Sequence, residues 1–539
     1  MPGAPRASRP RRRRRPRSAD RPVNARLYRI ALAGAAVAAL AVSFAIAHPD
    51  PLPVGPPPAF DATAALDAAA AIARQFPDRA PGTPGAARAA DFVARELALS
   101  GYSVERDRFT ASIAGRGDAP LENLVATARG RSARTIVVVA HRDDVGVGPG
   151  ADVNASGTAA LLELARIYGP ATEGGGGAVV PTHTIVFLST DGGAFGGLGA
   201  QRFARAARPR RIVAAVNLVA VAGRKRARLE IAGETARSPA STLVLTAAAR
   251  IREQTGEAPR RTGVLGQLID LAFPLSFYDH APFVAHDVPA VTITTASARP
   301  PEPFGDGPER LSAGRLAELG ASAQALVESL DQGLELAAGP ASYLYLGSRI
   351  AAGWAIQLAL LAVLAAFLLV LADLVLRAAR RGVAFVPALR SFARRLGFWL
   401  AAAGAFWLFG AAGAWADGPD RPISPHTDAA GDWAVRAVGL YCVLLLAGWL
   451  IARTRLLPER DAAPEDELGG YAVALLGVAV LGIATVVANP YALLFVLPSA
   501  HAWLWLPQLR ESSSWLRVGV FALGLAGPLV LLGSLAIRF

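Results

Sequence analysis

The sequence predicts a three-layer α/β domain, with a mixed central sheet between two layers of helices, joined to an all-α membrane region. Three observations support this. The 539 residues have a mean hydropathy of +0.35 and only 18% charged residues, which is typical of chains with several membrane spans. Apolar runs long enough to cross a bilayer lie near both ends of the chain. Between them, short apolar runs alternate with amphipathic stretches, as strands and helices do in α/β domains.

A basic segment begins the chain. Residues 1–27 include PRRRRRPR and carry much of the net charge of +13, and an apolar run at residues 28–48 follows at once. A basic arm can bind nucleic acid, but beside a span it is typical of a cytoplasmic tail that sets orientation, so we expect no nucleic-acid partner. We expect Ile30–Ala47 to be an uncleaved transmembrane anchor. A cleaved signal peptide is the alternative, because Ala-Ile-Ala precedes His48.

Six further apolar runs lie within residues 349–539. The loop Arg377–Arg395 has six arginines and no acidic residue, so it is expected in the cytoplasm, and the acidic loop after the next run is expected outside. Alternation of seven spans then makes the protein an integral, multi-pass membrane protein with a cytoplasmic N-terminus. Its segment 59–335, reached through a proline-rich linker at residues 49–58, lies outside the cytoplasm. The six runs are Ile350–Leu376, Leu396–Trp415, Trp433–Ala452, Tyr471–Val487, Tyr491–Leu506 and Val518–Ile537.

The spans themselves offer little chemistry. Their main polar residues are Gln357, Asp373, Arg436 and His501, and a transporter would normally place ionisable groups deeper in the membrane. Cys442 is the one cysteine of the chain, so the external segment must be stable without an intrachain disulfide.

Within residues 59–335, four apolar runs are predicted as buried strands and four stretches as helices. Asn154 or Ser156 is the expected N-cap of the third helix. The functional edge of such a domain is expected where the strands end and loops begin. The predicted strands are Arg134–Asp144, His183–Thr190, Arg211–Gly223 and Pro289–Ser297, and the predicted helices are Phe60–Phe76, Gly85–Tyr102, Asn154–Gly169 and Leu198–Ala207.

Polar motifs follow these strands in a characteristic order. They read VVAHRDDVGVGPGADVNASGTAALLELA, TDGGAFGGLGAQRFA and YDHAPFVAHDVPAV. Over about Phe60–Leu330 the chain resembles the di-zinc aminopeptidase family that includes aminopeptidase Y, glutamate carboxypeptidase and glutaminyl cyclase. The resemblance implies a site with two zinc ions that share a bridging aspartate, each ion also held by one histidine and a further carboxylate. A glutamate acts there as general base on the metal-bound water.

The histidines of that pattern are present. The resemblance matches His141 and His280 to the two histidine ligand positions, and Asp143 to the aspartate that supports the first histidine. The residues themselves also allow a purely structural role for both histidines, in packing and hydrogen bonding at strand ends.

The carboxylates of the pattern are absent. Val153 stands at the position of the bridging aspartate, Gly193 and Ala194 at the paired glutamates, and Val219 at the remaining carboxylate. Each zinc ion would keep one protein ligand where a catalytic site normally has three, and no base would remain. We therefore assign no catalytic residue, expect no cofactor, and regard His141 and His280 as remnant ligand positions.

These losses predict a membrane-anchored, peptidase-like protein without peptidase activity. Non-catalytic members of the resembling family, such as the transferrin receptor ectodomain and nicastrin, work by binding, so a peptide or protein ligand outside the cytoplasm is expected. The alternative is an active zinc exopeptidase with a rebuilt site. Asp144, Asp152 and Asp191 are the carboxylates near enough in sequence to rebuild it.

Overall fold

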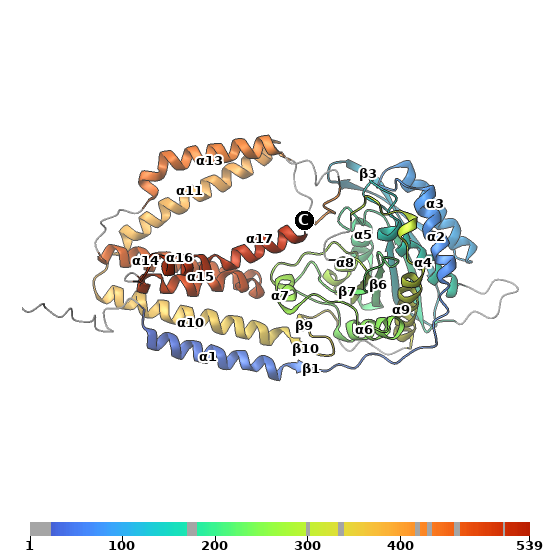
Figure 1. Cartoon of the computed structure of the whole chain (residues 1–539), viewed down its shortest axis with the longest axis horizontal. Coiled ribbons are helices and arrows are strands. Elements are labelled where there is room, and N and C mark those ends of the chain that lie inside the picture. The colour runs from blue at the N-terminus through green and yellow to red at the C-terminus, as the bar shows by residue number, and fades with distance from the viewer. Residues whose placement is uncertain are drawn as a thin grey trace, which may run out of the picture.

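The computed structural model describes residues 23–169, 180–297, 302–332, 339–415, 421–427, 434–457, 464–509 and 512–538. An α/β domain lies at one end of a group of long helices (Figure 1). The predicted fold class is confirmed, because the domain has a mixed seven-stranded sheet with helices on both faces and the C-terminal region is helical. Most of the predicted basic tail lies outside the described residues, and so does much of the stretch between the predicted helix Asn154–Gly169 and the strand that begins at His183.

The sheet has the order β2-β3-β5-β4-β6-β8-β7. Its four central strands are parallel and are the four that the sequence predicted, while the edge pairings β2–β3, β3–β5 and β7–β8 are antiparallel. The edge strand β2 carries charged residues on a half-exposed surface, so it lacks the apolar run that identified the central strands. The bounds are β2 Val104–Ile113, β3 Gly117–Ala128, β4 Ser132–His141, β5 His183–Thr190, β6 Ile212–Leu218, β7 Arg228–Glu230 and β8 Ala290–Thr294.

Helices cover both faces of this sheet. On one face α3, α4, α6 and α9 contact the strands, and α2 packs on α4 and α9; on the other face lie α5 and α8. Two buried apolar clusters fill the spaces between these layers and the sheet. The bounds are α2 Ala62–Gln75, α3 Pro84–Leu99, α4 Ser156–Ile167, α5 Leu198–Ala206, α6 Ser241–Thr255, α7 Val264–Ala272, α8 His280–Ala285 and α9 Ala313–Asp331.

The start of α4 differs from the prediction. A π-helical turn, Ala151–Ala155, precedes it, and neither Asn154 nor Ser156 caps the helix through its side chain. Instead the carboxylate of Asp306 accepts the N–H of Val153 at 3.1 Å and that of the preceding residue at 2.9 Å. The N-cap prediction was wrong because the acceptor comes from a loop about 150 residues away in the sequence.

Long helices form the rest of the structure. Four described helical segments, within α10, α13, α14 and η5–η6, are long and apolar enough to cross a membrane. The bent pair α16–α17, with an angle of 54°, makes a fifth if it counts as one span. The other two predicted runs coincide largely with α1 and α11. The bounds are α1 Ala25–Phe44, α10 Gly353–Arg380, α11 Phe385–Ala411, α13 Val435–Leu456, α14 Pro464–Ala488, η5 Pro490–Ala492, α15 Leu493–Trp505, η6 Leu506–Leu509, α16 Ser514–Gly524 and α17 Ala526–Arg538.

A small antiparallel sheet joins the domain to the helices. It has the order β1-β10-β9, from Ile46–Ala47, Ile350–Ala352 and Tyr343–Tyr345, so the first residues of the predicted run at Ile350 form a strand and not a helix. The connection between α14 and α15, which includes η5, also contacts α7 directly. Asn489 donates from its side chain to the carbonyl of Leu271 at 2.7 Å. These contacts hold the α7 side of the domain against the long helices (Figure 1).

Candidate functional site

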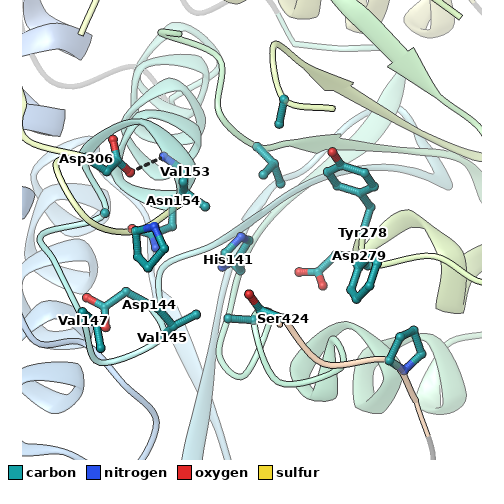
Figure 2. Close-up of a pocket in the computed structure, with 18 residues that line it drawn as sticks. His141, Asp144, Val145, Val147, Val153, Asn154, Tyr278, Asp279, Asp306 and Ser424 are labelled. Atoms are coloured by element: carbon teal, nitrogen blue, oxygen red, sulfur yellow. Dashed lines mark hydrogen bonds between the residues drawn. The ribbon is translucent and has the colours of Figure 1, made fainter. Parts of the chain in front are cut away.

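A cavity of about 70 Å³ lies where the parallel strands β4, β5 and β6 end. Figure 2 shows side chains converging on it from several loops. We call it the strand-end pocket. The family resemblance had placed five of its lining residues at the expected site, and this edge of a parallel sheet is the usual place for a binding site. The five are His141, Val153, Gly193, Ala194 and Val219; others are Asp144, Val145, Val147, Tyr278, Asp279, Asp306, Pro422 and Ser424.

His141, which lines the pocket, forms a buried pair with Asp143. Nδ1 of His141 lies 3.4 Å from a carboxylate oxygen of Asp143. Burial alone would lower the pKa of His141, but the hydrogen bond and charge of Asp143 outweigh it and raise the pKa to about 9. The same carboxylate accepts the backbone N–H of Gly193 at 2.8 Å and that of Ala194 at 3.0 Å. Asp143 therefore fixes the glycine-rich loop as well as the imidazole.

The imidazole of His141 occupies the space beside Gly193. A Cβ atom built on Gly193 would lie 2.4 Å from Cγ and 2.8 Å from Nδ1 of His141, which is far inside van der Waals contact. Any side chain at this position, including a glutamate, would require the histidine to move.

His280, the second predicted ligand position, does not line the pocket. Its Nδ1 lies 2.7 Å from Oγ1 of Thr292 and its Nε2 lies 3.0 Å from the carbonyl oxygen of Ala232, so both ring nitrogens have protein partners. Burial lowers the pKa of His280 to about 4, which keeps the ring neutral. The neighbouring Asp279 lines the pocket instead, and it accepts a hydrogen bond from the hydroxyl of Thr190 at 2.9 Å.

The three carboxylates named as candidates for a rebuilt site are also engaged. Asp144 lines the pocket but accepts the backbone N–H of Arg79 at 2.9 Å and lies 3.7 Å from its guanidinium group. Asp152 accepts the N–H of Ala222 at 2.9 Å and does not line the pocket. Asp191 pairs with the guanidinium of Arg142 at 3.2 Å behind the sheet edge.

Sequence reasoning missed two contributors to the pocket. Asp306, which caps the turn at Val153 (dashed line in Figure 2), comes from a loop without a recognisable motif. The other is the segment 421–427, between α11 and α13, which supplies Pro422 and Ser424. The sequence offered one indication of this contact. The loop was expected outside the cytoplasm, on the same side of the membrane as the domain.

The residues present do not fit a di-zinc centre. In the described parts of the chain, no group of three or more His, Cys, Asp or Glu side chains is arranged to hold a metal ion. The donors that remain near the expected site already bind protein atoms, and Val153 and Val219 offer no donor side chain. With so few protein ligands, a zinc ion would be more stable hydrated in solution than bound at this site.

Comparisons with known proteins agree with the resemblance. Residues 123–320 match the profile of peptidase family M28. Transferrin receptor protein 2 of Homo sapiens is 38% identical over 86 residues, which make up 16% of this chain and 10% of that receptor, so the chain spans only a tenth of this relative.

Similar solved structures include two enzymes. A glutaminyl cyclase from Fimbriiglobus ruber is 19% identical with a TM-score of 0.42, over 50% of this chain and 96% of that chain. BSAP, a zinc aminopeptidase from Bacillus subtilis, is 16% identical with a TM-score of 0.41, over 50% of this chain and 94% of that chain. The match of residues 123–320 to peptidase family M28 confirms the predicted resemblance to that group of peptidases.

Proposed function

We propose that this chain, whose residues 123–320 match peptidase family M28, is a membrane-anchored pseudopeptidase that binds a peptide or protein segment outside the cytoplasm. The observation that carries the proposal is the position of His141. Its ring fills the space in which a side chain at Gly193 would stand, so the pocket has been repacked around the absence of a glutamate.

Hydrolysis needs an activated water molecule and a base to take its proton. The base position, Gly193, has no side chain, and one histidine, His141, faces the pocket. Zinc, where such a site holds it, would supply a water of lowered pKa, but the ligand positions Val153 and Val219 are apolar. The pocket therefore keeps a concave surface at the sheet edge without the groups that would perform the reaction.

What remains is suited to binding. Val145, Val147 and Val153 supply apolar walls, with Tyr278 on another side (Figure 2), and Val219 adds to the apolar lining. The hydroxyl of Tyr278 donates to the carbonyl oxygen of Ser297 at 2.8 Å. The carboxylates of Asp144, Asp279 and Asp306 stand around these walls. An apolar surface with a few fixed polar groups is typical of sites that bind small ligands and peptide side chains. The charges favour a ligand with a cationic or hydrogen-bond-donating group.

The competing function is a zinc exopeptidase with a displaced site. It would have to use Asp144, Asp279 and Asp306 with His141. Asp144 accepts two backbone N–H groups, and Asp306 holds the turn before α4 through two more, so each would have to abandon those bonds to bind a metal. Because unmade buried hydrogen bonds cost about 1–3 kcal/mol each, this rearrangement is unfavourable.

The test is the zinc content and aminopeptidase activity of the full-length protein purified in detergent. After dialysis against a mild chelator, zinc should fall well below one ion per chain, and unblocked peptides should stay intact. Near-stoichiometric zinc that disappears in His141→Ala, together with cleavage of peptide N-termini, would contradict the proposal and support the displaced-site enzyme.

A further inference from the structure

A segment of the membrane region covers the strand-end pocket. Residues 421–427, RPISPHT, lie between α11 and α13, and Pro422 and Ser424 line the cavity (Figure 2). The backbone N–H of Ser424 donates to the carbonyl oxygen of Ala194 at 2.9 Å. Ile423 and Thr427 are only 8% and 2% exposed, so the segment is packed in place. We call it the covering segment.

Arg421 anchors the covering segment at one end. Its guanidinium forms an ion pair with Glu234 of the domain, and both side chains are largely buried, at 10% and 21% exposure. It also approaches the carbonyl oxygen of Gly197 at 3.5 Å. Because a partly buried ion pair is screened less than a surface pair, this contact favours one docked position.

The glycine-rich loop makes room for Arg421. Gly196 and Gly197 have φ angles of +95° and +65°, which side-chain-bearing residues rarely adopt. A Cβ on Gly196 would lie 3.3 Å from Cβ of Arg421, and one on Gly197 would lie 3.3 Å from its Nη1. The loop that would carry catalytic glutamates in the resembling family thus forms a surface on which the covering segment lies.

The far end of the covering segment closes as a turn. Both the N–H and the hydroxyl of Thr427 donate to the carbonyl oxygen of Ser424, at 3.1 and 2.9 Å. This turn preserves the conformation of the segment after the point where it contacts Ala194, so the ordering cost of docking is reduced.

Of the helices on either side, α11 packs on α14 and on α13, and α13 packs on α11. Neither α11 nor α13 has a buried residue, whereas α10, α14 and α15 share a buried apolar cluster. Figure 1 shows α11 and α13 running side by side, apart from the helices nearest the domain. The covering segment therefore links this helix pair directly to the domain, beside the indirect link from α11 through α14.

We propose that the covering segment is an intramolecular ligand of the strand-end pocket, and that the pocket accepts external peptides of the same chemistry: Arg-Pro, an apolar residue, then Ser. This rests on the proposed function as a binding protein. The remaining cavity, about 70 Å³, has room for roughly two water molecules. A peptide can enter only when the covering segment leaves. Binding of an external peptide therefore removes the direct contact between the domain and the connection from α11 to α13, which couples the pocket to these helices.

A disulfide trap tests the internal contact. In full-length protein with Cys442→Ser, the pair Ala194→Cys and Ser424→Cys should oxidise within the folded chain and lose reactivity toward maleimide-polyethylene glycol. Ser424→Cys paired with Glu257→Cys, just after the C-terminal end of α6, is the matched control and should keep both thiols. Equal reactivity of the two pairs would overturn the proposal.

Peptide binding tests the competition. Labelled RPISPHT should bind the full-length wild type weakly, because a tethered segment competes at high effective concentration. Arg421→Glu places like charges together at Glu234 and should tighten binding of the free peptide about 10- to 100-fold by emptying the pocket. Arg421→Lys should resemble the wild type, and the exchange Arg421→Glu with Glu234→Arg should restore the internal pair and weaken binding again. No gain in Arg421→Glu would overturn the proposal.

The non-catalytic function and the internal ligand are tested by different measurements. Zinc and peptide cleavage in the purified protein would contradict the non-catalytic function while leaving the disulfide result unchanged. Absence of the disulfide would remove the internal ligand and leave the non-catalytic function untouched.

Discussion

The backbone N–H of Ala220 donates to the carbonyl oxygen of Val153 at 3.1 Å. Two loops that would each carry a zinc-binding carboxylate in the resembling family are therefore joined directly. Ala220 adopts φ = +50°, which is costly for a residue with a side chain, and Thr295 holds it through two further bonds to its carbonyl oxygen. Val219 and Ala220 pack with Ala296 in a buried apolar cluster, where a metal pair would require negative charge.

Restoring the missing carboxylates is expected to fail. The variant Val153→Asp, Gly193→Glu, Ala194→Glu and Val219→Asp should show no zinc-dependent rise in melting temperature, because His280 faces Thr292 and Ala232. Burying new carboxylates without a metal should instead lower the stability by several kcal/mol. Thermal unfolding with and without zinc measures both effects, and a rise of several degrees with zinc would show that the strand ends still converge on a metal site.

The contact between Gly193 and His141 predicts that substitutions at these two positions have strongly coupled effects on the free energy of unfolding. Gly193→Ala should destabilise the protein by about 1–3 kcal/mol, since the new methyl group overlaps the imidazole. His141→Ala in the same chain should recover much of this loss, because it empties the space, and a double-mutant cycle measures the coupling. Gly314→Ala, in α9 with no atom within 4 Å of the new methyl group, is the control and should be neutral or slightly stabilising. Additive effects of the two site substitutions would contradict the geometry.

His280 predicts a loss of stability in acid. Its pKa is lowered from 6.5 to about 4 in the folded protein by burial, so below pH 6.5 the unfolded chain binds a proton more readily. Stability should fall by about 3 kcal/mol as the pH drops from about 6.5 to 4, and should be unaffected by this group above pH 7. In His280→Gln, which keeps a donor and an acceptor, this part of the pH dependence should vanish. Denaturant unfolding from pH 4 to 8 gives the free energy of unfolding of the wild type and of His280→Gln. If the two change with pH in parallel, His280 is not the cause of the loss in acid.

The predicted orientation can be tested by labelling intact cells. In a Cys442→Ser background, Glu257→Cys on the domain should react with a membrane-impermeant maleimide, and Ala384→Cys, at the start of α11, should react only after the membrane is opened. The reason is the cluster of arginines between Arg377 and Arg395, which favours the cytoplasm. The reverse pattern would place the domain inside.

The sequence alone determined the parts of this protein that depend on local pattern. Apolar runs identified the four central strands, and the lengths of the later runs located the long helices, because burial on both faces of a sheet or in a bilayer requires uninterrupted apolar residues. The motif order also located the pocket. His141, Val153 and Val219 meet because the ends of parallel strands share one edge of the sheet.

Only the tertiary structure decided what fills that edge. The direction of the His280 ring depends on Thr292 and Ala232, whose positions no local pattern specifies. Asp306 reaches the turn at Val153 from a loop remote in sequence, and the covering segment reaches Ala194 from 230 residues further along the chain. These contacts depend on how elements that are remote in the sequence pack together. Such contacts leave no periodicity in the sequence from which they could be predicted.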